Sequence, residues 1–173
     1  MKDGHKTPDS ATSSYAGIVS RESVRIALTY AALHDVEVLA ADIHNAYLQA
    51  PSSEKHFIIC GPEFGLENAG KVALIRRALY GGKVAGRDFW HHLRSCMEHE
   101  LKFKSSRADP DVWFREATRA NGEKYYEYVL LYVDDVLVIS DNADSIIREE
   151  IGQYFVLKEE LIGPPSQYLG GKL

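Results

Sequence analysis

The segment YVLLYVDDVLVIS (128–140) places two adjacent carboxylates, Asp134 and Asp135, inside the most apolar stretch of the chain. The β-branched and aliphatic residues on both sides predict two strands joined at the Asp pair. Two Asp residues would suit a solvated turn. However, the apolar residues continue right up to the pair, and the turn lacks the Asn-Gly or Asp-Gly sequence that tight hairpins favour. We therefore consider two roles for Asp134 and Asp135: they are turn residues, or they take part in chemistry.

A third carboxylate, Asp42, ends another expected strand, VEVLAADI (36–43). Adjacent carboxylates repel each other, and a divalent cation relieves the conflict because Mg²⁺ prefers hard oxygen ligands. Three carboxylates at the ends of adjacent strands are able to hold two metal ions roughly 4 Å apart for in-line phosphoryl transfer. Taken alone, Asp42 is equally typical of a strand end or a helix cap.

Composition is that of one globular domain with a sizeable core: 173 residues, 45% hydrophobic and 26% charged. No apolar run approaches the roughly 20 residues of a membrane span, and the polar N-terminus does not resemble a secretory signal. Two distant cysteines, Cys60 and Cys96, favour a reducing, intracellular setting. The net charge is −5, yet residues 71–107 hold nine Lys or Arg against three acids. That segment would suit phosphate binding, although a solvated helix face gives the same pattern.

The periodicity predicts an α+β fold in which an antiparallel sheet packs on helices, rather than a doubly wound parallel sheet. Helices are expected over 20–33, capped by Ser20, over 85–101, and from Asp141 or Asn142 to about 155. APSSEK (50–55) is expected to be a loop. Strands are expected in the following segments: 36–43, 56–60, the first part of 71–82, the end of 108–114, 124–133, 136–140, 155–160 and 166–173.

Five blocks of sequence resemble, in the same order, those of copia-type retrotransposon reverse transcriptases. The blocks are DIHNAYLQAP (42–51), RRALYGGKVAGRDFW (76–90), ADPDVW (108–113), YVDD (132–135) and QYLGGKL (167–173). The resemblance covers nearly the whole chain. It implies a right-hand polymerase palm with partial fingers and RNA-directed DNA polymerase activity. Two departures from the family pattern are Gly82, where Leu is usual, and Gly86, where Pro is common.

The resemblance also implies how the polymerase regions divide along the chain. The expected regions are a fingers remnant (1–35), the palm strand with the first catalytic Asp (36–50), part of the fingers (51–83), the palm with the YVDD hairpin (84–160) and the start of the primer grip (161–173). Thumb and RNase H segments are not recognised in this sequence. A chain with so little of the nucleic-acid clamp is expected to be weakly active or inactive by itself.

Site residues follow from the resemblance by position. Asp42, Asp134 and Asp135, with the backbone carbonyl of Ile43, would bind two Mg²⁺ or Mn²⁺ ions. The nucleotide site would comprise the backbone N–H groups of Asn45 and Ala46, Tyr47 as a steric gate against a 2′-OH, and the turn at Tyr80 and Gly81. Template and primer contacts would come from Arg76, Arg77, Lys83, Arg87, Tyr132, Leu169 and Gly170. Tyr47 would also suit a core position.

The implied partners are an RNA or DNA template with its primer, deoxynucleoside triphosphates, and the integrase and RNase H parts of a Pol polyprotein. No membrane is implied, and the family location is in cytoplasmic particles or the nucleus. One alternative is a truncated remnant that binds nucleic acid without catalysis. Another is a zinc module on the 85–101 helix, where His92, Cys96 and His99 fall at positions i, i+4 and i+7 and His91 is adjacent.

Overall fold

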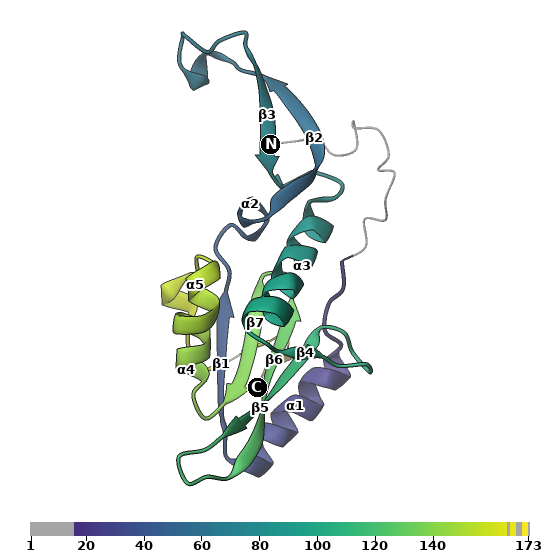
Figure 1. The fold of residues 1–173 in the computed structure, drawn as a ribbon, viewed down its shortest axis with the longest axis vertical. Coiled ribbons are helices and arrows are strands. Elements are labelled where there is room, and N and C mark those ends of the chain that lie inside the picture. The colour runs from purple at the N-terminus through teal and green to yellow at the C-terminus, as the bar shows by residue number, and fades with distance from the viewer. Residues whose placement is uncertain (1–15, 166, 169–170, 173) are drawn as a thin grey trace. The chain divides into compact units, whose positions relative to one another are not determined.

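A computed structural model describes residues 16–165, 167–168 and 171–172 of the chain (Figure 1). The described residues form two compact units. The first unit contains Ala16 and Asn45–His92, and the second contains Gly17–His44 and the chain from Leu93 onward. The three carboxylates of interest all belong to the second unit, whereas the two tyrosines expected at the nucleotide site belong to the first.

The second unit is built on a five-stranded sheet in which every neighbouring pair is antiparallel (Figure 1). Its spatial order is β1 (Glu37–Asp42), β7 (Asp135–Ser140), β6 (Lys124–Tyr132), β5 (Val112–Thr118) and β4 (Lys104–Ser105). The mixed fold of helices and antiparallel sheet predicted from the sequence is therefore confirmed. The two strands expected around the YVDD block are β6 and β7, and they pair directly.

The core of this unit is centred on β7, whose residues 136–139 are fully buried. Successive side chains of a strand point to opposite faces, so both faces of β7 are covered. One face packs on α1 (Arg21–His34), because its apolar stripe joins Leu137 and Ile139 in a single cluster. This double burial explains why the YVDD flanks are continuously apolar instead of alternating.

Helix α1 begins where the sequence predicted, and an acidic residue of the ADPDVW block fixes its start. The Ser20 side chain caps the helix by accepting a hydrogen bond from the Ser23 N–H at 3.1 Å. Asp109 Oδ2 accepts two more, from the Ser20 N–H at 2.9 Å and from the Ser23 hydroxyl at 2.6 Å. Asp109 therefore has a structural role, in that it ties the loop before β5 to the start of α1.

Two further helical segments were predicted, and each contains a π-helical stretch. The first consists of α3 (Ala85–Ser95) and a π-helical turn (Cys96–Glu100). The second consists of α4 (Ala143–Ser145), a π-helical stretch (Ile146–Ile151) and α5 (Gly152–Tyr154). Asn142 precedes the second helix without a side-chain capping bond. Within the described part of the chain, no helix is both long and apolar enough to cross a membrane.

The first unit contains a long antiparallel hairpin of β2 (Pro51–Ile59) and β3 (Val72–Arg77), together with α2 (Ala46–Gln49), a 3₁₀ turn (Pro62–Phe64) and the first part of α3. The expected loop over 50–55 is wrong, because β2 starts at Pro51. Its polar residues alternate between exposed and half-buried positions, so no continuous apolar signal marks this strand. Pro51 pairs with Arg77 of β3, and the register shifts between Pro51 and His56. This pairing with β3 extends the hairpin into the segment that was expected to be a loop.

The strand expected over 155–160 is also wrong. Only Leu157 forms a β-bridge there, with Ile43, and the chain then turns into a 3₁₀ helix at Glu159–Leu161. Of the apolar start FVL, Phe155 and Leu157 are buried and Val156 is exposed, and no regular ladder to β1 forms. The last expected strand is instead a small hairpin of β8 (Gln167–Tyr168) and β9 (Gly171–Lys172).

Candidate active site

Two of the three carboxylates lie directly opposite each other on adjacent strands. Asp42 ends β1 and Asp135 begins β7, and the antiparallel register pairs their Cα positions. Tyr132, the last residue of β6, is paired with Asp135 in the same way. Because directly paired residues of adjacent strands share a face, Asp42, Asp135 and Tyr132 form one row across three strands at one end of the sheet.

Asp134 lies in the two-residue turn between β6 and β7, next to this row. Val133, the other turn residue, has φ +56°, in the left-handed region that β-branched residues rarely adopt. The Asp134 carbonyl oxygen accepts a hydrogen bond from the Ile43 N–H at 2.9 Å. This bond ties the turn to the residue that follows Asp42. The structure therefore brings the three Asp residues together. The register of β1 and β7 pairs Asp42 with Asp135, and the hydrogen bond from Ile43 holds Asp134 next to them.

Lys158 is a fourth charged residue at this site, and the sequence analysis missed it. Its ammonium nitrogen lies 2.7 Å from Asp42 Oδ1. The backbone sets this position, because the Lys158 N–H donates to the Asp42 carbonyl oxygen at 2.9 Å. The sequence signal was weak: one Lys directly after the apolar FVL. Such a position does not indicate a partner on a distant strand.

The charges of the site shift the pKa values of Asp135 and Lys158. Burial raises the pKa of Asp135, and the nearby Asp134 and Asp42 carboxylates raise that pKa further, while Lys158 partly offsets the effect. The contact with Asp42 raises the pKa of Lys158, which favours its ammonium form. A carboxyl group with a raised pKa inside a carboxylate cluster, as at Asp135, is typical of sites that bind cations or transfer protons.

The donor set at this site fits a divalent cation in its chemistry. Carboxylate oxygens are the ligands that Mg²⁺ prefers. Asp42 Oδ1 is buried, and among the described residues no hydrogen bond of standard geometry reaches it, so the Lys158 ammonium is what offsets its charge. Among the described residues, no group of three or more His, Cys, Asp or Glu side chains has an arrangement that could hold a metal ion. The carboxylates are close together but not yet arranged around a common ion position.

The zinc alternative on the 85–101 helix gains no support from the structure. In the described part of the chain, no group of three or more His, Cys, Asp or Glu side chains is placed to hold a metal ion around His91, His92, Cys96 or His99. Burial, together with the Glu100 carboxylate, raises the pKa of the Cys96 thiol to about 11. Zinc binds the thiolate, so this cysteine is poorly suited as a ligand.

In the first unit, the two aromatic residues expected at the nucleotide site are in contact. Tyr47 stacks on Tyr80, with ring centroids 4.6 Å apart and planes inclined by 27°. The ring of Phe89 on α3 lies 6.1 Å from that of Tyr47. A Cβ on Gly86 would meet the Tyr47 hydroxyl at 3.5 Å, an ordinary contact. The structure thus brings α2, the turn after β3 and the start of α3 together around the ring of Tyr47.

The remaining nucleotide-site positions lie at turns of this unit. Asn45 has φ +47° and precedes α2, of which Ala46 is the first, fully buried residue. Gly81 has φ +82°, so the turn after Tyr80 does need a glycine there. Gly82, by contrast, is not among the residues with positive φ. Its replacement of the usual Leu is therefore not required by the backbone conformation.

The basic residues expected to face template phosphates differ in their surroundings. Arg76 and Arg77 are exposed on β3, and Arg77 also donates to the Gln49 carbonyl oxygen at 2.8 Å. Lys83 is half-buried. The primer-grip positions Leu169 and Gly170 lie outside the described residues.

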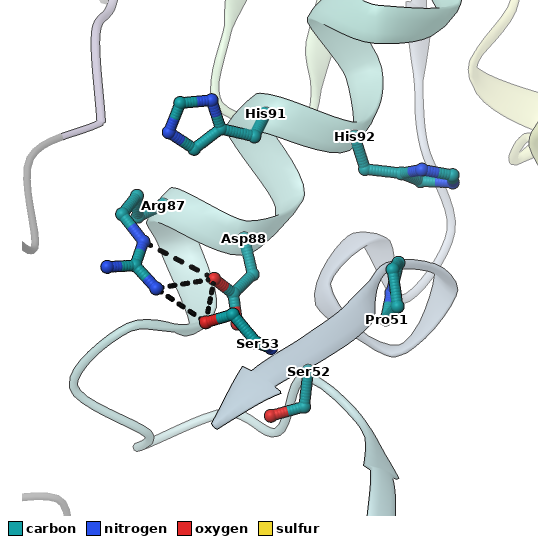
Figure 2. Close-up of a pocket in the computed structure, with 7 residues that line it drawn as sticks. All are labelled: Pro51, Ser52, Ser53, Arg87, Asp88, His91 and His92. Carbon is teal, nitrogen blue, oxygen red and sulfur yellow. Dashed lines mark hydrogen bonds and ion pairs between the residues drawn. The ribbon is translucent and has the colours of Figure 1, made fainter. Parts of the chain in front are cut away.

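Arg87 is bonded within the protein, at one side of a pocket of about 620 Å³ between β2 and α3 (Figure 2). Its guanidinium lies 2.9 Å from Asp88 Oδ1 and also donates to the Ser53 hydroxyl. Asp88 in turn accepts from the Ser53 N–H at 2.9 Å. Figure 2 shows these groups joined, with His91 and His92 on the next turn of the helix. The charge of Arg87 is thus largely offset by Asp88.

Comparisons with known proteins agree with the motifs. The family model described as reverse transcriptase (RNA-dependent DNA polymerase) matches residues 7–173. The retrovirus-related Pol polyprotein from transposon TNT 1-94 of Nicotiana tabacum is 31% identical over 92% of this chain and 12% of that polyprotein. Those from transposons RE2 and RE1 of Arabidopsis thaliana are 25% and 24% identical, each over 84% of this chain and 10% of the polyprotein. The chain therefore spans about a tenth of these relatives. It belongs to the reverse transcriptase family, in the copia-type branch of retrotransposon Pol polyproteins.

Proposed function

We propose that this chain is the polymerase core of a copia-type Pol polyprotein and adds deoxynucleotides to a primer 3′-OH on an RNA template. The observation that carries the proposal is the register that opposes Asp42 to Asp135, with Asp134 in the adjoining turn. We assign the palm to 36–50 and 84–160. We assign the fingers to 1–35 and 51–83, and the start of the primer grip to 161–173.

Asp42, Asp134 and Asp135 would hold two Mg²⁺ or Mn²⁺ ions, with the Ile43 backbone carbonyl as a further ligand. When bound, such ions lower the pKa of an attacking hydroxyl and stabilise charge on the leaving oxygens. The chain itself supplies position. Strand register sets Asp42 against Asp135, and the hydrogen bond from Ile43 sets the Asp134 turn. The nucleophile is the primer hydroxyl, so no Ser or His nucleophile is required from the protein.

The incoming deoxynucleoside triphosphate would bind beside α2. The backbone N–H groups of Asn45 and Ala46 would donate to the triphosphate, and Tyr47 would lie under the sugar and exclude a 2′-OH. Tyr80 and Gly81 would pack on the nucleotide and the template base. The stacking of Tyr47 on Tyr80 supports a shared role for these two side chains.

Template and primer would contact the basic and primer-grip positions. The template backbone would lie along Arg76, Arg77, Lys83 and Arg87, and the primer end would lie near Tyr132, Leu169 and Gly170. Exposure of Arg76 and Arg77 supports phosphate contacts at these two residues. The integrase and RNase H parts of the polyprotein would be its covalent partners, in cytoplasmic particles or the nucleus.

Primer extension tests this function directly. We expect the chain to extend oligo(dT) on poly(rA) only weakly with dTTP and Mg²⁺ or Mn²⁺, because much of the nucleic-acid clamp is not recognised in its sequence, and we expect the Asp134→Asn variant to lose that extension. The Asp144→Asn variant is the matched control, because Asp144 is an exposed residue of α4 away from the site. Extension that survives in Asp134→Asn would refute the proposed role of the YVDD pair.

A second outcome of the same experiment would favour the remnant alternative. The chain spans about a tenth of its Pol relatives, and polymerisation needs a nucleic-acid clamp as well as metal ligands. Binding of primer–template without extension, in the wild-type chain, would assign it binding alone. Extension restored by adding flanking polyprotein segments would then locate the missing clamp outside these 173 residues.

A further inference from the structure

Lys158 is the charged residue of the carboxylate site to which the proposed function gives no role. We propose that the Lys158 ammonium occupies a cation position beside Asp42 in the metal-free chain, and that a divalent cation binds there by displacing it. Lys158 is then a positioning residue that controls when Asp42 is open to metal. This inference rests on the proposed function, because it takes Asp42 to be a metal ligand.

The backbone holds Lys158 at Asp42 independently of the ion pair. Segment 156–163 runs along the outer edge of β1, on the side away from β7. Four backbone hydrogen bonds of 2.8 to 3.1 Å attach this segment to the chain at β1. The His44 N–H donates to the Val156 carbonyl oxygen, and the Lys158 N–H donates to that of Asp42. Ala40 and Gly163 each donate to the carbonyl oxygen of the other. Whatever the side chain does, the Lys158 Cα stays beside Asp42.

The ion pair adds charge compensation more than stability. The side chains of Lys158 and Asp42 are 32% and 19% exposed, and in a partly buried ion pair the cost of desolvating both charges offsets much of their attraction. The segment is already held by its backbone bonds. What the ammonium does supply is a positive charge 2.7 Å from a buried carboxylate oxygen. That charge offsets the repulsion among Asp42, Asp134 and Asp135.

A divalent cation and the ammonium would compete for the same carboxylate. Mg²⁺ binds carboxylate oxygens at about 2.1 Å, so an ion on Asp42 Oδ1 would lie within roughly 5 Å of the Lys158 nitrogen. Like charges at that separation repel strongly in a partly buried site. The flexible four-carbon stem of Lys allows the ammonium to swing toward water. The absence of a ready-made metal-binding group among the described side chains is consistent with a site that Lys158 holds closed.

Mn²⁺ titration of the metal-free chain, followed by electron paramagnetic resonance, measures the competition. We expect the Lys158→Met variant, which keeps the side-chain length without the charge, to bind Mn²⁺ about tenfold more tightly than wild type. The Lys158→Arg variant keeps the charge and should remain within about threefold of wild type. Unchanged or weaker Mn²⁺ binding by Lys158→Met would overturn the inference.

Two controls separate displacement from other effects. The Lys124→Met variant removes an exposed charge at the far end of β6, and equal tightening in this variant would overturn the inference by showing a net-charge effect. Circular dichroism of each variant checks that it is folded. If neither the wild-type chain nor Lys158→Met binds Mn²⁺, both the inference and the metal-dependent function are refuted.

A measurement on the unmodified chain tests displacement without any variant. Brief acetylation of lysines, read by mass spectrometry, is compared with and without saturating Mg²⁺. Displacement predicts at least a threefold rise in Lys158 acetylation, roughly the effect of breaking a modest contact, and no change at Lys124. If Mn²⁺ binds but Lys158 reactivity stays constant, the cation and the ammonium share the site. That result overturns the inference and leaves the proposed function standing.

Discussion

Tyr47 is the side chain whose proposed role makes the sharpest chemical prediction. A steric gate works by contact with a 2′-OH, so its removal admits ribonucleotides. We expect Tyr47→Ala to raise the preference for a ribonucleotide over the deoxynucleotide of the same base by at least about tenfold. Single-nucleotide primer extension measures this ratio. The Tyr47→Phe variant keeps the ring that stacks on Tyr80 and should retain discrimination. Unchanged discrimination in Tyr47→Ala would make Tyr47 a packing residue only.

The hydrogen bonds to Asp109 predict that the stability of the chain depends on pH. Burial alone would raise the pKa of Asp109, but hydrogen bonds from Ser23 and Ser20 outweigh it and hold the pKa below its usual value. A carboxyl whose pKa is lowered by folding stabilises the native state above its unfolded pKa of about 3.9. That contribution is lost as the pH falls through the folded-state pKa. We therefore expect part of the acid sensitivity of this fold to arise at Asp109.

The Asp109→Asn variant tests this contribution. We expect it to lower the free energy of unfolding by about 1–2 kcal/mol near neutral pH, because charge-assisted hydrogen bonds to the start of α1 are weakened. Near pH 3 the difference from wild type should shrink. Urea unfolding at both pH values gives the comparison. Asp144→Asn, at an exposed position paired with Arg148, should change stability by less than about 0.5 kcal/mol. An equal loss for Asp109→Asn at both pH values would contradict the assignment.

The sequence singled out the three Asp residues, which the structure brings together, because their surroundings are locally unusual. Asp134 and Asp135 interrupt a fully apolar run, and Asp42 ends another such run. Lys158 has no such local mark. Its partnership with Asp42 arises from edge pairing between segments far apart in the chain. Side chains selected by local pattern were thus predictable, whereas a contact made only by tertiary pairing was not.

Among the helices and strands, the wrong predictions share one cause. The predicted elements that the structure contains bury a clear apolar face, as α1, β6 and β7 do. The polar start of β2 has no such face, whereas 155–160 buries Phe155 and Leu157 without becoming a strand. β2 exists because β3 pairs with it, and 155–160 follows β1 through single bridges. Local hydrophobic pattern cannot show pairing that is set by a neighbouring strand.

Gly163 allows the attachment of segment 156–163 to be tested. Its N–H donates to the Ala40 carbonyl oxygen at 3.1 Å, and a Cβ at this glycine would meet no atom within 4 Å. We expect Gly163→Pro, which removes the donor, to destabilise the chain by about 1–3 kcal/mol. Gly163→Ala keeps the donor and should be nearly neutral. Urea unfolding and hydrogen exchange of the Ala40 amide report both effects. Equal behaviour of the two variants would show that this bond is unimportant.

Across the chain as a whole, positive charge is concentrated in residues 71–107 although the net charge is −5. If this segment contacts nucleic-acid phosphates, primer–template affinity must fall steeply with salt, because binding releases condensed counterions. Exposed Arg76 lies in this segment, and exposed Arg148, which pairs with Asp144 and Glu159, lies outside it. The two arginines make a matched pair.

Arg76→Gln should reduce the slope of log affinity against log salt by about one. Arg148→Gln should leave the slope unchanged, since its charge is already offset and lies outside the basic segment. Fluorescence anisotropy of a labelled primer–template across a salt series measures both slopes. Equal slopes for wild type and Arg76→Gln would remove Arg76 from the binding surface.

The strip of chain laid along β1 also bears on how the protein behaves at high concentration. With segment 156–163 on one edge and the two-residue, lysine-bearing β4 at the other, the five-stranded sheet offers little free backbone to a strand from another molecule. The β2–β3 hairpin differs, because Phe57 and Ile59 are 62% and 76% exposed. Aggregation of purified chain would therefore begin at the hairpin and spare the sheet that carries the carboxylates.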